Sequence, residues 1–288
     1  MTDNYIPGVC ETLATLRRTQ PLVHSITNYV TVNDCANILI AFGASPIMAD
    51  EPDEMAEIVS ISSGVNINLG TLNRRTIEAM HCACQSASER GLTLTLDPVG
   101  VGASSLRYNT ALELLKKYRF TAIRGNMSEL MTLSRGVSGG QGVDASENDL
   151  VSEATIADRA RYLRDLAQTT HATVVASGAI DLATDGVDLY GVYNGCASMA
   201  QISGSGCMLT AVLNAFLASE RLTGSPLSDL LTVTYATSAY GVCGELADEY
   251  VKSSNLGSGS LRVALIDAAS NLTSDRLMGK CIIQRLSF

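Results

Sequence analysis

A glycine-rich turn at the start of an apolar segment is the part of the sequence best suited to chemistry. It reads Gly204-Ser-Gly-Cys-Met-Leu-Thr, and the residues that follow have the spacing of an amphipathic helix. Glycine lets a ligand approach the backbone closely, and the free N–H groups of a first helical turn attract anions. The turn lacks the Lys-Ser/Thr pair of a P-loop and does not follow a strand, as a dinucleotide-binding turn does. It therefore predicts a phosphate site of another type, with a plain helix start as the alternative.

Cys207 lies in the first turn of that expected helix. There the helix dipole would lower its pKa or orient the thiol toward a bound hydroxyl, which makes it a candidate catalytic residue. Inert packing is the ordinary role of a free cysteine. The other cysteines, at positions 10, 35, 82, 84, 196, 243 and 281, show no disulfide spacing, and the N-terminus has no secretory pattern, so we expect reduced thiols in a cytoplasmic protein. For the His81-Cys82-Ala83-Cys84 cluster we expect helix packing rather than a metal site.

Two further polar groups follow expected strands. Arg124, Asn126 and Glu129 come at the end of one strand, and Asp97 ends another before a proline. Because open α/β sheets bind ligands at the carboxyl ends of their strands, these side chains are expected to share one crevice, where Asp97 could hold a metal ion or a water. The alternatives are structural: Asn126 and Glu129 have the spacing of a capping box, and Asp-Pro is a common turn.

An alternation of short strands and longer helices must position these residues. Strands are expected at 45–49, 65–69, 92–97, 122–124 and 173–177, and helices at 32–42, 52–60, 73–90, 106–117, 128–134 and 156–169. This order is typical of an α/β fold with a mainly parallel sheet. Asp185-Gly186, between 180–184 and 188–193, predicts a hairpin and so an antiparallel edge. Helices at 206–220, 228–251 and 260–272 complete the chain, and His24 is expected in a loop.

Composition limits the classes of function. The 288 residues carry 20 Lys+Arg and 29 Asp+Glu, a formal charge of 20 − 29 = −9, which argues against nucleic acid as the main partner. The hydrophobic fraction of 46% excludes a disordered chain. No apolar run approaches the roughly 20 residues that cross a bilayer, so no membrane span is expected. The Gly- and Ser-rich segment 135–148 is interpreted as a mobile surface loop inside a single domain, residues 1–288.

Taken together, the three polar elements resemble the ribokinase-like superfamily of small-molecule kinases. Asn126-Met-Ser-Glu129 is similar to its Asn-x-x-Glu motif, and the turn at Gly204 is similar to its anion hole. Longer stretches narrow the match: Pro21-Leu-Val-His-Ser-Ile-Thr-Asn, Ala44-Ser-Pro-Ile-Met-Ala-Asp, Leu96-Asp-Pro-Val-Gly-Val-Gly-Ala and Gly206-Cys-Met-Leu-Thr resemble the hydroxyethylthiazole kinases. The resemblance runs from about residue 10 to the C-terminus. It implies a three-layer α/β/α fold, with an antiparallel edge on the sheet and without a separate lid domain.

The resemblance also implies an activity and a set of site residues. The activity is Mg²⁺-dependent transfer of the γ-phosphoryl group of ATP to the hydroxyl of 4-methyl-5-(2-hydroxyethyl)thiazole, a salvage step toward thiamine, in a homotrimer with sites between subunits. Carried over by position, Arg124, Ser177 and Asn126 contact ATP, Asp97 and Glu129 hold Mg²⁺, Met48, Gly204 and Asn28 contact the thiazole, and Cys207 is the catalytic residue. The superfamily usually has Asp at the last position, and a thiol is a weaker match to a base.

Other interpretations stay open at this level. Without the resemblance, Met48 would be assigned to core packing and Ser177 to a turn. The chain has no Trp, so aliphatic groups of the C-terminal helices are expected to hold adenine. The same superfamily includes ADP- or ATP-dependent dehydratases that repair hydrated nicotinamide cofactors. A non-catalytic nucleotide-binding protein is a third interpretation, which the joint presence of Asp97, Arg124, Glu129 and Cys207 disfavours.

Overall fold

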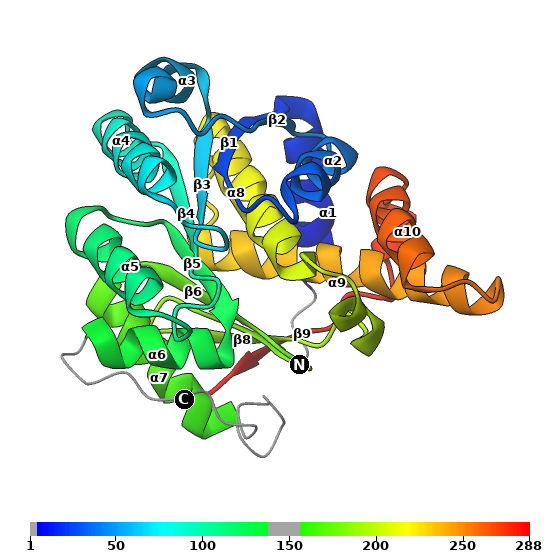
Figure 1. Ribbon diagram of the computed structural model, residues 1–288. Coiled ribbons are helices and arrows are strands. Elements are labelled where there is room, and N and C mark those ends of the chain that lie inside the picture. Colours follow the sequence, from blue (N-terminus) through cyan, green and yellow to red (C-terminus); the bar gives the residue numbers. More distant parts are fainter. Residues whose placement is uncertain (1–4, 138–155) are drawn as a thin grey trace.

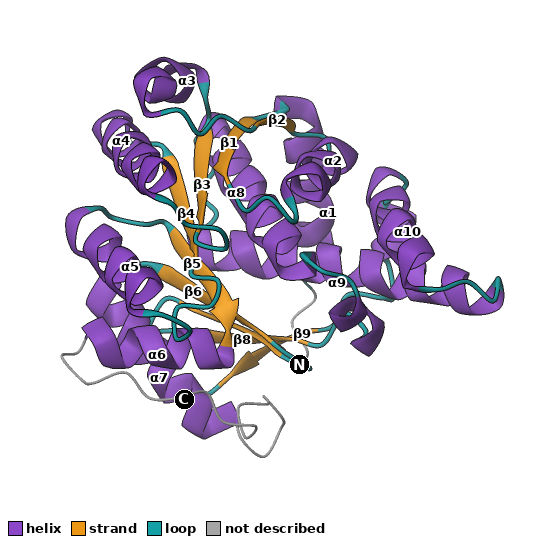
Figure 2. Ribbon diagram, viewed as in Figure 1, coloured by secondary structure: helices purple, strands orange, loops and turns teal. Residues whose placement is uncertain are grey.

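A mixed sheet forms the centre of the fold. The computed structural model describes residues 5–137 and 156–288. In that part of the chain, a nine-stranded sheet has the order β2-β1-β3-β4-β5-β6-β7-β8-β9. Neighbouring strands from β2 to β6 are parallel, and β7, β8 and β9 are antiparallel (Figure 2). The strands are β1 Leu22–Ile26, β2 Ser45–Ile47, β3 Gly64–Asn68, β4 Thr93–Asp97, β5 Ala122–Asn126, β6 Thr173–Ser177, β7 Asp181–Thr184, β8 Leu189–Val192 and β9 Ile283–Leu286.

Helices cover both faces of this sheet, which gives three layers (Figure 1). One hydrophobic cluster joins the sheet to α1, α2, α8, α9 and α10, and a second joins it to α3, α4, α5, α6 and α7. The helices are α1 Ile6–Thr19, α2 Val32–Phe42, α3 Met55–Ile61, α4 Arg74–Arg90, α5 Ser105–Lys117, α6 Met127–Val137, α7 Ile156–Thr170, α8 Ser205–Thr223, α9 Asp229–Ser253, α10 Ser258–Ser270 and α11 Ser274–Leu277. Two 3-10 turns, η1 Pro52–Glu54 and η2 Ala197–Gln201, accompany them.

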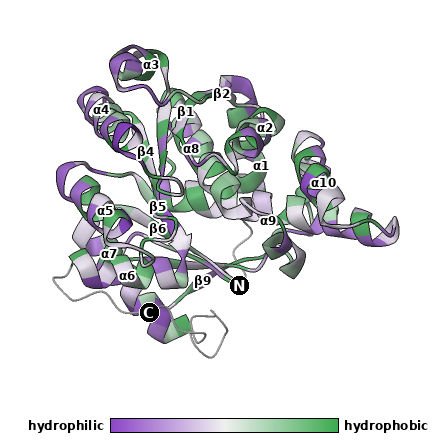
Figure 3. Ribbon diagram, viewed as in Figure 1, coloured by the Kyte–Doolittle hydropathy of each residue, from purple (hydrophilic) through white to green (hydrophobic). Residues whose placement is uncertain are grey.

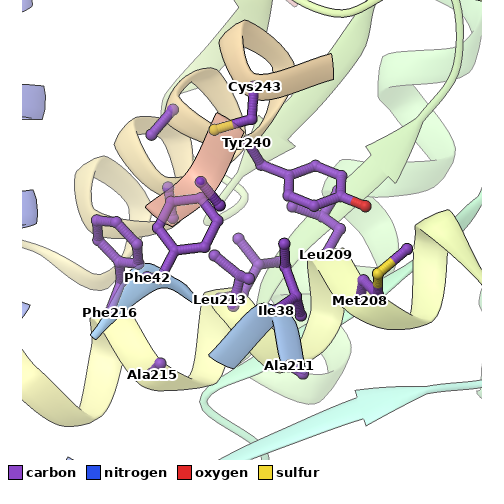
Figure 4. Packing of buried hydrophobic residues seen from close by; sticks show 14 of the residues in the cluster. Ile38, Phe42, Met208, Leu209, Ala211, Leu213, Ala215, Phe216, Tyr240 and Cys243 are labelled. Carbon is purple, nitrogen blue, oxygen red and sulfur yellow. The ribbon is translucent and has the colours of Figure 1, made fainter. Parts of the chain in front are cut away.

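Helix α8 is buried on every side. All of its residues from Cys207 to Glu220 are buried, and Figure 3 shows hydrophobic colour along it. Phe216 meets Phe42 of α2 edge to face with ring centroids 5.9 Å apart, an arrangement that contributes about 1 kcal/mol beyond its burial. Figure 4 shows Leu213 beside these rings and Tyr240 of α9 near Leu209. Because interiors are close-packed, α8 cannot shift without repacking its neighbours, so its N-terminus is held at a fixed place on the sheet.

Most of the predicted elements are confirmed, including the parallel sheet and the hairpin with its antiparallel edge. Two helices and two strands are missing from the sequence analysis, α1, α11, β1 and β9, as is the 3-10 turn η2. The expectation of a loop at His24 is wrong, because His24 is fully buried in β1, where its Nε2 lies 2.9 Å from the Ala49 carbonyl oxygen. The polar pair His24-Ser25 interrupts the apolar run that usually marks a strand buried on both faces.

Three expectations concern features outside the sheet. Most of the 135–148 segment lies outside the described residues, and residues 135–137 end α6 rather than starting a loop. Cys84 is a buried residue of α4 and packs in the core. In residues 5–137 and 156–288, no group of three or more His, Cys, Asp or Glu side chains could hold a metal ion. Within those same ranges, no helix has the length and apolar character needed to span a membrane.

Candidate active site

Polar side chains gather where the parallel strands end, next to the first turn of α8. Asn68, Asp97, Asn126 and Ser177 are the last residues of β3, β4, β5 and β6. In Figure 1 these strand ends lie along one edge of the sheet. Since ligands of open α/β sheets bind outside the carboxyl ends of the strands, this edge is the expected place for a site. The parallel order predicted from the sequence is what brings these four positions together.

The N-terminus of α8 has the features of an anion site. Gly204 is its N-cap and has a φ of +87°, a left-handed conformation that favours glycine. A Cβ there would lie 2.2 Å from Cγ2 of Thr31, so a side chain would also collide with the chain that follows β1. Among the described residues, no side chain caps this helix. Its first N–H groups therefore remain available for the oxygens of a bound phosphate.

Arg124 lies directly against that first turn. Its Nη1 is 3.7 Å from Asp97 Oδ2, and its Nη2 donates to the hydroxyl of Ser177. A Cβ on Gly206 would lie 2.3 Å from Nη1, so the guanidinium occupies the space that a side chain at that position would need. Arg124 is almost fully buried, which strengthens its interaction with charge because little water screens it. This cation, next to the free N–H groups of α8, would neutralise a phosphoryl group.

Asp97 is a fully buried carboxylate with an open coordination position. Its Oδ2 accepts a hydrogen bond of 2.8 Å from the Thr210 hydroxyl, whereas its Oδ1 has no hydrogen-bond partner among the described residues. Burial raises the pKa of Asp97 to about 6, Arg124 opposes that rise, and Glu129 adds to it. A buried acceptor without a partner is costly, so Oδ1 is a candidate ligand for a bound group.

Glu129 forms the capping box and also holds the loop that follows β4. Its Oε2 accepts the Asn126 N–H at 2.9 Å, while Asn126 Oδ1 accepts the Glu129 N–H at 2.9 Å, so the capping box is real. Its Oε1 accepts the Gly100 N–H at 2.7 Å, in the loop that follows β4. The carboxylate is thereby fixed close enough to Asp97 to raise the pKa of that residue. Two carboxylates facing one crevice are hard oxygen donors of the kind that Mg²⁺ prefers.

Cys207 faces the same crevice, but its thiol is not activated. Asn28 donates from Nδ2 to the Cys207 sulfur at 3.3 Å. Burial raises the pKa of Cys207, Asp97 raises it further, and the polar side chains of Asn68, Asn28 and Thr31 beside the thiol only partly compensate. The expectation that the helix end lowers this pKa is therefore wrong, because the cost of burying a thiolate outweighs the helix dipole. The thiol stays protonated near neutral pH.

Met48 stands apart from these polar contacts. It follows β2, is half-buried, and packs against the hydrophobic cluster that contains Cys207. The structure thus shows the packing against the core that we considered for Met48 as the alternative to a binding role. Its thioether can also present a soft apolar surface to a flat ring, since methionine fills irregular spaces well.

Three residues that support the site were missed by the sequence analysis. Arg107 donates to the carbonyls of Leu69 at 2.9 Å, Gly70 at 2.6 Å and Val99 at 2.6 Å, which ties the loop after β3 to the loop after β4. Tyr240 donates to the Ser205 carbonyl at 2.8 Å and so fixes the first turn of α8. Asn68 accepts from Asn28 Nδ2 at 3.1 Å. Of these three residues, only Asn68 could have been found from the sequence, because it is a polar residue near the end of an expected strand.

The fold and this cluster together define a class of protein, the small-molecule kinases with a ribokinase-like fold. Pyridoxal kinase from Staphylococcus aureus, solved with AMP-PCP and pyridoxal, has this fold: its TM-score is 0.54 at 16% identity, over 78% of this chain and 88% of that one. At that identity the likeness concerns the fold alone.

Closer relatives give the family. A model of the Hydroxyethylthiazole kinase family matches residues 13–275, so the chain belongs to that family. Hydroxyethylthiazole kinase from Clostridium acetobutylicum is 46% identical over 93% of this chain and 96% of its own length. A relative of the same name from Desulfovibrio desulfuricans is 43% identical over 95% of this chain and 97% of its own length. The solved hydroxyethylthiazole kinase protein from Pyrococcus horikoshii OT3 has a TM-score of 0.84 at 29% identity and covers 98% of this chain and 100% of that one.

Proposed function

We propose that this protein transfers the γ-phosphoryl group of ATP to the hydroxyl of 4-methyl-5-(2-hydroxyethyl)thiazole, in thiamine salvage. The observation that carries the proposal is the contact of the Arg124–Asp97 pair with the first turn of α8. A buried cation, a buried carboxylate with an open oxygen, and free helix N–H groups meet there. Phosphoryl transfer through a loose transition state needs mainly positioning and neutralisation of charge, which these groups supply.

ATP binding is assigned to the polar ends of β5 and β6. Arg124 and the Ser177 hydroxyl, which are hydrogen bonded to each other, face the phosphates, and Asn126 fixes the start of α6 beside them. Since ATP is a cytoplasmic substrate, the proposal includes a cytoplasmic location. It also treats residues 1–288 as one domain. The net charge of −9 does not oppose nucleotide binding, because the local field near Arg124 and the α8 N–H groups is positive.

Mg²⁺ binding is assigned to Asp97 and Glu129. The open Oδ1 of Asp97 is suited to bind a cation. Two carboxylates with no third such ligand in residues 5–137 and 156–288 suit an ion that keeps waters and phosphate oxygens in its shell. When bound, the ion supplies neutralising charge on the phosphates. Arg124 and Thr210 hold the Asp97 carboxylate from its Oδ2 side, which leaves Oδ1 free for that purpose.

The acceptor alcohol is assigned to the space beside Cys207, with Asn28, Gly204 and Met48 lining it. Because the Cys207 thiol is protonated, it cannot take up the proton of the alcohol; its sulfur orients the alcohol by accepting a hydrogen bond from the hydroxyl, and the proton leaves late, to an oxygen of the transferred phosphoryl group. A loose transition state tolerates this, since little proton removal is needed early. A thiol at this position therefore serves to orient the alcohol, and the reaction does not require a strong base there.

A homotrimer with sites between subunits is part of the proposal. Tyr29 and Val30, next to Asn28, leave 62% and 68% of their surface exposed. Apolar side chains exposed at the rim of a site are typical of an interface. Cavities of about 990 and 500 Å³ lie on the opposite side, where residues such as Phe120 and Thr173 border the amino ends of the strands. We infer that a second copy of the chain covers Tyr29 and Val30 and supplies a wall of the candidate site.

The purified protein is expected to release ADP when it is given Mg·ATP and hydroxyethylthiazole, and to do so faster than with hydroxymethylpyrimidine. Excess EDTA should stop the reaction, because the carboxylates of Asp97 and Glu129 would face the ATP phosphates without a cation between them. A coupled ADP-release assay measures both effects, and detection of the phosphorylated thiazole identifies the product.

Other outcomes of this assay would favour other functions. A preference for the pyrimidine, or ADP release that is equal without any alcohol, would contradict the thiazole assignment. Consumption of hydrated NADH without thiazole phosphorylation would identify a repair dehydratase, and nucleotide binding without turnover a binding protein. The relatives disfavour both, since those at 36% to 46% identity carry the name hydroxyethylthiazole kinase.

Replacing Cys207 by Ala is expected to lower kcat by about 10²-fold, because the acceptor alcohol loses the contact that orients it for attack. The Kd for ATP should stay nearly unchanged, since Arg124 and the α8 N–H groups remain. Cys35→Ala is a matched control, because Cys35 is also buried in the first turn of a helix and donates to the Thr31 hydroxyl at 3.8 Å. Steady-state kinetics and calorimetry measure the two quantities, and equal losses in both would argue against the role of Cys207.

A further inference from the structure

Asn68, at the end of β3, is a fully buried amide in the middle of the candidate site. Its Oδ1 accepts two hydrogen bonds, one from Asn28 Nδ2 at 3.1 Å and one from the Gly70 N–H at 2.9 Å. Only 1% of its surface is exposed. An amide oxygen has two acceptor positions, so both are in use.

The two bonds settle which way the amide points. Both donors lie on the side of the loop after β3, so the oxygen must face them and the nitrogen must face away. Arg107 holds that loop through the carbonyls of Leu69 and Gly70, and Gly70 admits Asn28 because a Cβ there would lie 2.7 Å from Asn28 Cβ. The orientation of Asn68 is therefore fixed by a rigid turn rather than by a ligand.

The nitrogen of Asn68 is left facing the site. Among the described residues, Nδ2 has no hydrogen-bond partner. Asn68 stands directly opposite Asp97 in the register of β3 and β4, and it lowers the pKa of Asp97 and that of Cys207, against the larger effect of burial on each. Nδ2 thus lies between the open carboxylate and the thiol. A buried N–H donor without an acceptor is costly, and an acceptor on a bound ligand would remove that cost.

Asn66 shows why this feature is specific to position 68. Its side chain lies on the same face of β3, is fully buried, and also has an Nδ2 without a partner among the described residues. It sits two residues deeper, where its Oδ1 accepts from the Thr95 hydroxyl at 3.0 Å and Asn214 of α8 donates to that same hydroxyl at 3.3 Å. In the part of the chain that the structure describes, Asn214 Oδ1 is an acceptor without a partner in the same buried layer, so Asn66 belongs to internal packing.

We propose that Asn68 donates a hydrogen bond from Nδ2 to the hydroxyl oxygen of the acceptor alcohol and so selects alcohols at this site. The inference rests on the proposed function, which places the alcohol beside Cys207. Asn28 donates to the sulfur and to Asn68, so its two amide hydrogens are both occupied, and Asn68 supplies the free donor. A donor at the oxygen directs a lone pair toward the phosphoryl group and leaves the hydroxyl hydrogen for Cys207. Sites that hydrogen bond a substrate hydroxyl reject analogues that lack it.

A ligand-by-variant cycle tests this role. Calorimetry gives the Kd of hydroxyethylthiazole and of 5-ethyl-4-methylthiazole, which lacks only the hydroxyl, for the wild-type protein, Asn68→Ala and Asn66→Ala. The wild-type preference for the alcohol should fall by about tenfold in Asn68→Ala, the size of one well-made hydrogen bond. The preference should persist in Asn66→Ala, which removes an equally buried amide. Asn68→Leu, which fills the volume without a donor, repeats the measurement should the Ala variant not fold.

Each outcome has a distinct meaning. Because the readout is a ratio of two affinities within one variant, a general loosening of the site lowers both affinities and leaves the ratio unchanged. An unchanged ratio in both Asn68 variants, with a clear preference in the wild type, would overturn the role of Asn68 and leave the proposed function intact. A wild-type protein that neither binds nor phosphorylates hydroxyethylthiazole would overturn the proposed function, and this inference with it.

Discussion

Asp97→Asn should remove nearly all kinase activity and at the same time make the protein more stable at neutral pH. The amide cannot balance Arg124 or supply an anionic oxygen to Mg²⁺, so we expect kcat to fall by about 10³-fold, the upper range for loss of one group that stabilises charge. The gain in stability has a separate origin. Burial raises the pKa of Asp97 from 3.8 to about 6, so keeping this carboxylate ionised at neutral pH lowers the stability of the folded state.

The pH dependence follows from the sign of that shift. Between pH 3.8 and about 6 the folded state binds a proton at Asp97 more tightly than the unfolded state does, so stability falls as pH rises through this range. Asp97→Asn removes the effect: the variant should match the wild type below pH 4 and exceed it above pH 6. A shift of about two pKa units corresponds to about 3 kcal/mol, which bounds the gain in the free energy of unfolding.

Asp181→Asn provides the matched comparison. Burial also raises the pKa of Asp181 to about 6, and its Oδ1 accepts the Gly178 N–H at 2.8 Å, a bond that an Asn oxygen can keep. Its side chain is only half-buried, so the gain in stability should be smaller, and most of the activity should persist. Thermal unfolding from pH 4 to pH 8 and steady-state kinetics measure both variants. An Asp97→Asn protein that is less stable at every pH would show that the ion pair with Arg124 outweighs the cost of burial.

The layout of the site could be predicted because it follows from chain order. Parallel strands must end at the same edge, so Asp97, Asn126 and Ser177 converge once their strands are recognised. The glycine turn at Gly204 could be recognised in the sequence for a similar reason, since few residues other than glycine adopt its left-handed backbone conformation. Features with a single local cause, such as strand order and the backbone conformation of a glycine turn, can therefore be predicted from the sequence.

The environment of each side chain could not be predicted in the same way. The helix dipole at Cys207 is a local feature, whereas the burial that raises the pKa of its thiol comes from strands and helices distant in sequence. Arg107, in the first turn of α5, supports two loops, whereas its residue type alone suggests only a surface cation. Strand β1 was missed because His24 and Ser25 are polar but buried, and only the neighbouring strands reveal that.

Gly206→Ala is expected to lower kcat/KM by about 10²- to 10³-fold with little change in thermal stability, because it displaces one critical cation. The added Cβ would lie 2.3 Å from Nη1 and 2.6 Å from Nη2 of Arg124. The end of a flexible side chain can swing away at small cost, so the fold should persist. The guanidinium would then leave Asp97 and Ser177, and the phosphates would lose the cation beside the α8 N–H groups.

Gly259→Ala in α10 is the control, since a Cβ there meets no atom within 4 Å. It should keep full activity and be slightly more stable, because alanine favours helix more than glycine does. Melting temperature, the Kd for ATP and kcat are measured for both variants, and Gly206→Ala should weaken ATP binding as well as turnover. That pattern differs from Cys207→Ala, which spares nucleotide affinity although residues 206 and 207 are adjacent. If Gly206→Ala instead left both ATP affinity and turnover unchanged, Arg124 would act equally well from another position. Its contact with the first turn of α8 would then not be what binds the phosphoryl group.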